Sequence, residues 1–166
     1  MTPDEERIRA ERRRFVEANR TAVYGYPRRE DGPSMTVVYY QLDGDDLLVT
    51  TMSARAKARV ARVEAQASLC VLDEKWPMSY VLLFCTAAVE ENLEATVDAM
   101  MTVRAIMAGS PMPESIRPVV EQTARDEGRL VIRLRPHHTF TTPPQHVYRP
   151  EDNATLAHPP GELLPW

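Results

Sequence analysis

Five short apolar runs follow one another between residues 21 and 89, and they constrain the fold more than any other feature of the sequence. Turn-forming residues separate the first three runs, which is the pattern of β-strands joined by tight connections. Asp31-Gly32 marks one such turn and "DGDD" at 43–46 marks the next. We therefore expect an antiparallel meander built from TAVYGY (21–26), MTVVYYQL (35–42), LLVTT (47–51), ASLCVL (67–72) and SYVLLFCTAAV (79–89).

Helical periodicity flanks these runs on both sides. Residues 3–20 predict a charged helix with a thin apolar stripe, and residues 55–64 predict a short basic helix directly after the third strand. Two more helices are expected, one from an Asn N-cap to a Gly stop over 92–109 and one over 116–128. The alternating segment RLVIRLR at 129–135 predicts a final half-buried strand.

This order of elements predicts a mostly β or α+β fold, in which an antiparallel sheet or small barrel carries helices on its outside. The chain of 166 residues is long enough to bury one core. We expect an N-terminal helix over 1–20, one main domain over 21–140, and an extended proline-rich tail over 141–166 that either wraps a neighbour or stays mobile.

Charge and composition exclude several classes of partner. A net charge of −4 and a pI near 5.6 argue against a nucleic-acid or anionic-membrane surface. No apolar run approaches the roughly 20 residues of a membrane span, and the charged N-terminus does not resemble a signal peptide, so we expect a cytoplasmic protein. Cys70 and Cys85 lie in apolar runs and are expected to be buried free thiols. The histidines lack zinc spacing with these cysteines, so no metal site is predicted.

The segment TTMSARAKARV at 50–60 is the strongest candidate site. A helix start attracts anions, and Thr50, Thr51 and Ser53 would add hydroxyl donors while Arg55 and Lys57 would add charge. The alternative is a strand, a turn and a solvated helix face, and spacing alone leaves both interpretations open. The six glycines form no dinucleotide or P-loop motif, and no nucleophile elbow is present.

Two further features stand near apolar strands. Trp76 and Tyr80 in DEKWPMSY could pack at a sheet edge or cover a planar ring. His137 and His138, at the end of the last strand, could line a site or a dimer seam, or could be solvated.

With these motifs in place, the chain resembles the split β-barrel flavoproteins, the superfamily of pyridoxamine 5'-phosphate oxidase and its deazaflavin-dependent relatives. The resemblance runs from about Arg20 to Phe140 and is carried by MTVVYYQLDGDDLLVTTMSARAK and ASLCVLDEKWPMSYVLLFCTAAVE. It implies an antiparallel split β-barrel with flanking helices, assembled as a homodimer that holds the coenzyme at its interface. It also implies that Thr50 and Thr51 are the hydroxyl pair of the phosphate site, and that Lys57 is the phosphate-binding lysine.

The resemblance further implies that the segment from Met35 to Tyr40 runs under the ring system and that Tyr80 lies near the coenzyme. The expected cofactor-binding residues are therefore Met35, Thr36, Val37, Val38, Tyr39, Tyr40, Thr50, Thr51, Ser53, Arg55, Ala56, Lys57, Trp76 and Tyr80. No catalytic residue is assigned.

Departures from the oxidase pattern select among the branches of this superfamily. Ala56 stands where the oxidases have a second cation, Met35 and Tyr40 replace cations at both ends of the ring strand, and the R-L-x-P motif is absent from PPGELLPW. The sequence Arg55-Ala56-Lys57 is similar to the phosphate segment of the actinobacterial branch that uses coenzyme F-420. We therefore favour F-420 over FMN as the coenzyme.

The resemblance implies an oxidoreductase that passes a hydride to or from a small unsaturated substrate. The alternatives are a non-catalytic flavin or haem carrier on the same fold, or a plain interaction module.

Overall fold

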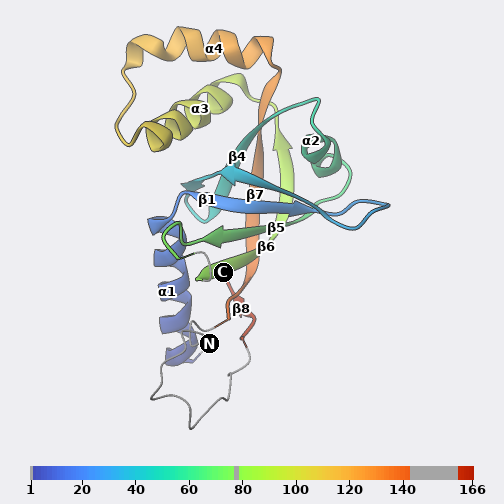
Figure 1. Ribbon diagram of the computed structural model, residues 1–166, viewed down its shortest axis with the longest axis vertical. Coiled ribbons are helices and arrows are strands. Elements are labelled where there is room, and N and C mark those ends of the chain that lie inside the picture. The colour runs from blue at the N-terminus through green and yellow to red at the C-terminus, as the bar shows by residue number, and fades with distance from the viewer. Residues whose placement is uncertain (1, 77–78, 143–160) are drawn as a thin grey trace.

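The fold is an antiparallel half-barrel with helices on its outside, as the order of apolar runs predicted (Figure 1). The computed structural model describes residues 2–76, 79–142 and 161–166. The helices are α1 (Pro3–Ala18), α2 (Ala56–Ala61), α3 (Leu93–Ala108), the 3-10 turn η1 (Glu114–Ile116) and α4 (Arg117–Asp126). The strands are β1 (Thr21–Tyr26), β2 (Ser34–Tyr39), β3 (Gln41–Asp43), β4 (Asp46–Met52), β5 (Gln66–Leu72), β6 (Tyr80–Glu90), β7 (Arg129–Phe140) and β8 (Leu164–Pro165).

The sheet curls because its two end strands are consecutive in the chain. The order is β2-β1-β5-β6-β7-β4-β3, with every pairing antiparallel, and β3 begins two residues after β2 ends. The interior is filled by alternate residues of the strands, as the two-residue repeat of a β-strand requires. Fully buried members of this core include Tyr24, Leu47, Val49, Leu69, Val71, Leu83, Ile132 and Leu134.

The predicted strand over 35–42 is wrong in one respect, because it is divided at Tyr40. The first part pairs with β1 and the second with β4, so the chain changes partner there. The buried Tyr40 hydroxyl donates to the carbonyl oxygens of Val16 and Asn19, at 2.6 and 2.9 Å, at the end of α1. Tyr40 therefore fixes α1 to the barrel at the bend.

β7 runs to Phe140, five residues beyond the end predicted from alternation. The register against β6 passes from Phe84↔His138 to Cys85↔Pro136, so His137 is an extra residue in a β-bulge. Proline has no amide hydrogen to donate to the ladder and is tolerated at bulges, which fits Pro136. The bulge interrupts the alternation that the prediction relied on.

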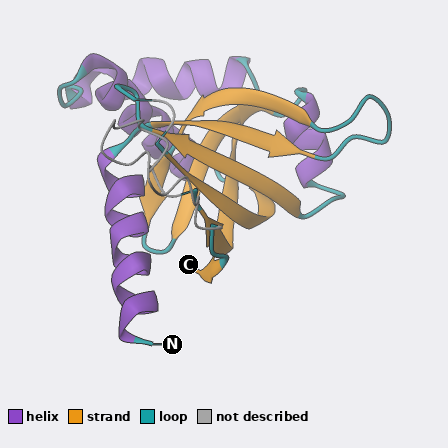
Figure 2. Ribbon diagram, turned by 60° about the horizontal axis from the view of Figure 1, so that its bottom comes forward, coloured by secondary structure: helices purple, strands orange, loops and turns teal. Residues whose placement is uncertain are grey.

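The helices cover different sides of the barrel (Figures 1 and 2). α3 and α4 lie together over one end, where α3 packs on β4 and β7 through the small cluster of Leu48, Ala99 and Val131. The predicted caps of α3 are confirmed, since Asn92 accepts from Ala95 N at 3.1 Å and Gly109 adopts a left-handed conformation. α1 runs down another side and α2 lies apart from both groups.

The two cysteines differ in their surroundings. Cys85 is buried in the core, and burial raises the pKa of its thiol to about 12. Cys70 is only half-buried on the outside of the sheet, so the expectation of burial is wrong for it in part, although burial still raises its pKa. Both thiols are free.

The last six residues, 161–166, return to the barrel, and we call them the strap. The strap contains β8, which pairs with β7 at His138↔Pro165 and Thr139↔Leu164. Trp166 is buried with the core residues, which differs from the wrapping or mobile tail expected for 141–166. Residues 143–160 of that tail lie outside the described residues. Within the described ranges, no helix has both the length and the apolar character needed to cross a membrane.

Candidate functional site

A buried lysine lies where β1, β2 and α2 meet. The chain leaves β4 at Met52, turns, and begins α2 at Ala56, which places Lys57 in the first turn with 7% of its surface exposed. Its Nζ donates to Thr36 Oγ1 at 2.7 Å and lies 5.7 Å from the centre of the Tyr24 ring. The lysine is therefore held by one hydroxyl and one aromatic face.

No carboxylate among the described residues forms an ion pair with Lys57. Burial lowers the pKa of its ammonium group, and the charge of the nearby Arg55 lowers it further. Burying a charge without a counter-ion is unfavourable. The site therefore favours an anionic ligand beside the lysine.

The predicted hydroxyl pair is divided between two faces of β4. Adjacent residues of a strand point to opposite sides, and Thr51 shares its side with the core residues Leu47 and Val49. Thr51 is buried at 3% exposure, whereas Thr50 is half-buried on the side of Leu48, which packs under α3. Within one chain the two hydroxyls therefore lie on opposite sides of β4, and only Thr51 lies on the inner side.

The turn before α2 supplies further polar groups. Ser53 N donates to Gly128 O at 2.8 Å, which fixes the turn to the start of β7. Arg55 is the N-cap residue of α2 and makes no side-chain capping bond, and Ala56 beside it is exposed. The Arg59 guanidinium, one turn along α2, donates to Ala54 O. Lys57, Thr36, Tyr24, Thr51 and Arg55 together are called the Lys57 site below.

The predicted ring strand also divides into two faces. Met35 and Val37 point outward and are 68% and 75% exposed, while Thr36 bonds Lys57 and Val38 joins the core. Tyr39 is half-buried. The Tyr40 side chain is buried and its hydroxyl is bonded to the end of α1.

Trp76 and Tyr80 lie toward the other end of β5 and β6. Tyr80 pairs with Leu72, four residues along β5 from Ser68, which is opposite Gly25 beside the Lys57 site. Four residues of strand span about 13 Å. The Tyr80 hydroxyl bonds Thr142 at 2.7 Å, and Trp76 is 52% exposed. Within one chain, these two residues do not meet the Lys57 site.

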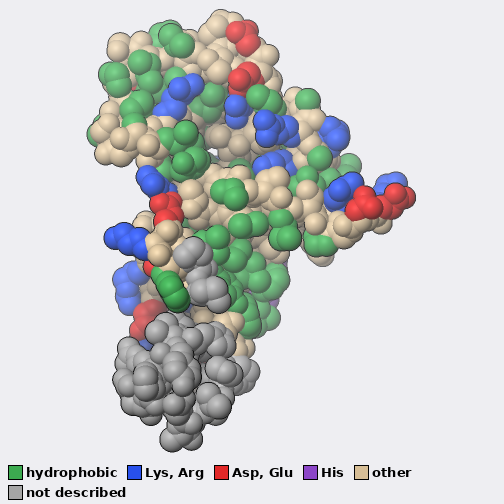
Figure 3. Space-filling view, viewed as in Figure 1, with side chains coloured by type: hydrophobic (Ala, Val, Ile, Leu, Met, Phe, Trp, Pro, Cys, Tyr) green, Lys and Arg blue, Asp and Glu red, His purple; other side chains and the backbone are tan. Residues whose placement is uncertain are grey.

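An apolar face covers the outside of β2, β1, β5 and β6, and Figure 3 shows its side chains gathered below α3 and α4. Apart from the two exposed side chains on β2, its members are half-buried, as expected for one side of an alternating strand. We call it the outer face, and it contains Val23, Met35, Val37, Cys70, Leu72, Leu82 and Phe84.

A hollow of about 550 Å³ lies in the outer face. It follows a row of directly paired residues that crosses four strands, Met35, Gly25, Ser68 and Phe84. The two small residues in the middle of the row leave space that the larger ones flank. Its lining also includes Gln66, Ala67, Cys85, Thr86 and the bulged His137.

The two histidines both lie in β7 and are exposed, with their rings edge to face at 5.2 Å between centres. His137 lines the outer-face hollow. The sequence therefore identified a residue of this hollow, but it missed Tyr24 beside Lys57. A glycine inside strand β1 was the available signal for the hollow, because such glycines often mark a close approach of another group.

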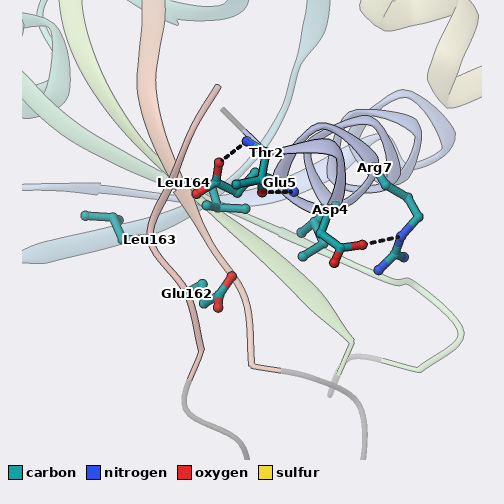
Figure 4. Close-up of a pocket in the computed structure, with 8 residues that line it drawn as sticks. Thr2, Asp4, Glu5, Arg7, Glu162, Leu163 and Leu164 are labelled. Atoms are coloured by element: carbon teal, nitrogen blue, oxygen red, sulfur yellow. Dashed lines mark hydrogen bonds and ion pairs between the residues drawn. The ribbon is translucent and has the colours of Figure 1, made fainter.

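A second hollow of about 480 Å³ lies between the start of α1 and the strap (Figure 4). Its polar side chains already serve the helix, since Thr2 and Glu5 form a capping box and Asp4 lies 3.7 Å from Arg7. We assign no chemistry to this hollow. Among the described residues, no group of three or more His, Cys, Asp or Glu side chains is arranged to hold a metal ion.

Comparison with known proteins shows that several solved structures share this split β-barrel fold. The structure is similar to the conserved hypothetical protein Rv2991 of Mycobacterium tuberculosis, at a TM-score of 0.67 and 21% identity over 84% of this chain and 82% of that one. It is similar to an F-420 reductase at a TM-score of 0.56 and 17% identity, over 72% and 88% of the two chains.

Other proteins with this fold have different described roles. One is a protein of the pyridoxinephosphate oxidase family related to general stress protein 26, from Clostridium acetobutylicum, at a TM-score of 0.61 and 10% identity over 94% and 92% of the chains. Another is the haem storage protein HutZ of Vibrio cholerae, at 0.52 and 16% over 76% and 88%. No protein-family model and no curated protein sequence matches this chain. At these identities the comparisons establish the fold.

Proposed function

We propose that the protein is an oxidoreductase that binds coenzyme F-420 or FMN by its phosphate at the Lys57 site. The observation that carries this proposal is the buried ammonium group of Lys57, which has a hydroxyl and a ring as neighbours and no carboxylate among the described residues. A phosphate would neutralise it and accept further bonds from the Thr51 hydroxyl and the Arg55 guanidinium. Solved proteins with this fold include an F-420 reductase, which supports the choice of coenzyme class.

The chain's own residues bind and orient the coenzyme in this proposal. Lys57 and Arg55 would anchor the phosphate, Thr36 would fix the direction of the lysine through its bond to Nζ, and the backbone of β2 from Met35 to Val37 would support the ring. The bound coenzyme would supply hydride chemistry toward a small unsaturated organic substrate.

We further propose a homodimer formed through the outer face. Contiguous exposed apolar surface marks interfaces in soluble proteins, and the outer face is the apolar surface of the described sheet. A second copy would also bring Trp76 and Tyr80, which do not reach the Lys57 site of their own chain.

Substitution of the exposed Val37 tests the dimer. Val37→Asp should convert a dimer to a monomer, measured by light scattering after size-exclusion chromatography, because a charge would be desolvated at the interface. Val63→Asp is the matched control, since Val63 is 86% exposed and lies outside the outer face. A monomeric wild-type protein, or a dimer unaffected by Val37→Asp, would contradict this arrangement.

Coenzyme binding is tested by titration of the purified protein with FMN and with F-420, followed by fluorescence. Lys57→Ala should weaken binding by the worth of a charge-assisted bond, about 1.5 to 3 kcal/mol or roughly 10- to 150-fold. Arg59→Ala, on an exposed residue of the same helix whose guanidinium bonds Ala54 O, should change affinity less than threefold. Equal effects of the two variants would refute the placement of the phosphate.

A second candidate function is haem binding without catalysis. The adjacent exposed histidines on β7 favour it, and a haem storage protein has the same fold. In that case titration with haemin should give a sharp Soret band that His137→Ala and His138→Ala reduce and Lys57→Ala leaves unchanged. Binding of FMN or F-420 that Lys57→Ala weakens and the two histidine variants leave unchanged supports the coenzyme proposal instead.

A further inference from the structure

The strap completes the sheet where β4 stops. β4 pairs with β7 only over residues 129–134, so the far half of β7 lacks that neighbour. The strap takes its place through the pairs His138↔Pro165 and Thr139↔Leu164, and Trp166 N donates to His137 O at 3.4 Å. An unpaired strand edge would otherwise expose its amide and carbonyl groups. The strap therefore bonds to the same residues that follow the bulge.

Trp166 fixes the end of the strap to the barrel. Its ring is buried in the core with 9% exposure, its Nε1 donates to Asp45 O at 2.7 Å, and the Arg13 guanidinium lies 5.1 Å from the ring centre. Asp45 directly precedes β4. Trp166 thus connects the start of β4 to the bulge in β7.

Arg12 holds the other part of the strap. This residue of α1 is 5% exposed and donates to Thr139 O, Thr139 Oγ1 and Glu162 O, each at 2.9 Å. The strap also passes close to β7 at Gly161, where an added Cβ would lie 2.5 Å from the Phe140 ring and 2.6 Å from Thr141 O. No side chain larger than hydrogen fits there without a shift of the backbone.

His137 lies next to both anchors of the strap. Its carbonyl oxygen accepts from Trp166 N, and Thr139, which Arg12 binds, is two residues further along β7. As the extra residue of the bulge it has no partner of its own in the β6 register, and it lines the outer-face hollow, as Phe84 and Thr86 do. Bulges commonly re-aim a side chain next to a functional site. On the edge of β7 that faces away from β6, the strap fixes the backbone of His137.

We propose that His137 contacts the substrate in the outer-face hollow, and that Trp166 and Arg12 are positioning residues that hold its bulge through the strap. In the homodimer proposed above, this hollow would lie between the two copies and the substrate would be enclosed there. The hollow has the volume typical of a small-molecule site, and its lining combines apolar groups with the imidazole and the hydroxyls of Ser68 and Thr86. Such a lining fits a small planar molecule with a hydrogen-bond acceptor, such as a quinone or another conjugated carbonyl compound. The substrate part of this inference rests on the proposed function.

Five variants of the full chain test the inference, with menadione as the quinone probe. His137→Gln removes the imidazole, and His138→Gln is the matched control on the neighbouring residue. Trp166→Ala removes the anchor, and Trp166→Phe keeps an aromatic ring in the core. Gly161→Ala displaces the strap from Phe140 while leaving Trp166 intact, so it serves if Trp166→Ala does not fold.

The first measurement needs no coenzyme. In NMR spectra of the imidazole Cε1–Hε1 groups, Trp166→Ala or Gly161→Ala should shift the His137 signal, and menadione should perturb that signal in the wild type more than the His138 signal. Trp166→Phe should restore the wild-type spectrum. If the His137 signal is unchanged in both Trp166→Ala and Gly161→Ala, the positioning role is overturned. If menadione does not shift the His137 signal of the wild type, the ligand contact is overturned.

The second measurement uses whichever coenzyme the wild type binds. His137→Gln and Trp166→Ala should raise the KM for menadione at least tenfold with a smaller change in kcat, while His138→Gln and Trp166→Phe stay within threefold. Coenzyme affinity should not change in any of them. Failure of the wild type to bind either coenzyme would refute the proposed function alone, because the NMR comparison still decides the role of the strap.

Discussion

Two buried cations of this protein have opposite surroundings. Arg12 is 5% exposed and donates to three oxygen atoms of β7 and the strap, whereas Lys57 is 7% exposed and donates to one hydroxyl. Burial lowers the pKa of both side chains. Equal burial therefore does not mean equal bonding. Arg12 donates three bonds to the chain and leaves only its buried Nε without a partner, whereas Lys57 donates one bond among the described residues.

The difference follows from the chemistry of the two groups. A guanidinium offers five donors in a rigid plane and can join several backbone carbonyls at once, which suits a structural clamp. An ammonium is a compact charge that rotates freely and suits a single anion. We infer that Arg12 contributes to stability and Lys57 to binding, and each inference can be tested by substitution.

The largest effect is expected at Arg12. Arg12→Ala should lower the free energy of unfolding by about 3 kcal/mol or more, since it removes three bonds from a charged donor and leaves buried oxygens unpaired. Urea denaturation measures this loss. Arg14→Ala, on an exposed residue of the same helix, should stay within about 0.5 kcal/mol of the wild type. A small loss in both variants would show that the strap is not held by Arg12.

The contrasting prediction is that loss of Lys57 does not destabilise the coenzyme-free protein. Lys57→Met keeps the aliphatic packing and removes a buried charge, so the free energy of unfolding should stay equal or rise by about 1 kcal/mol. The same urea experiment applies. A loss as large as that of Arg12→Ala would erase the distinction between the two cations.

A smaller effect is expected in how the stability difference between Lys57→Met and the wild type changes with pH. The pKa of Lys57 is lowered by burial from its ordinary value of 10.5, so the unfolded chain holds the proton more tightly than the native one. Native stability should therefore rise with pH in the window below 10.5, where the native lysine has lost its proton and the unfolded one has not. The gap between Lys57→Met and the wild type should narrow from pH 7 to pH 10 in urea titrations, and a widening gap would contradict the lowered pKa.

Much of the fold followed from the sequence because local patterns and tertiary contacts agree there. The apolar runs became β1, β2, β4, β5 and β6, and the caps of α3 are where Asn92 and Gly109 indicated. Periodicity failed at Tyr40, where the chain changes partner strand, and at His137, where a bulge inserts a residue. Both are tertiary events that a two-residue repeat does not record.

The site was predictable to the extent that it is local. The segment after β4 places Lys57 at a helix start as its spacing suggested, but alternation along β4 separates Thr50 from Thr51. Tyr24 comes from a strand that is distant in sequence, and the strap depends on Arg12 and Trp166, which lie at opposite ends of the chain. Neighbourhoods of this kind exist only after the sheet has curled.

The smallest predicted effect tests the single bond that holds Lys57. Thr36→Val removes the hydroxyl that accepts from Nζ at 2.7 Å and preserves the shape of the side chain. Coenzyme affinity should fall by about 1 kcal/mol, or roughly fivefold, because the freed ammonium is no longer directed toward the phosphate. Thr50→Val is the matched control, since Thr50 faces the α3 side of β4 and should leave affinity unchanged in the same fluorescence titration. If Thr50→Val weakened coenzyme binding as much as Thr36→Val, the Thr50 hydroxyl would have to contact the phosphate. The separation of Thr50 from the Lys57 site would then be wrong.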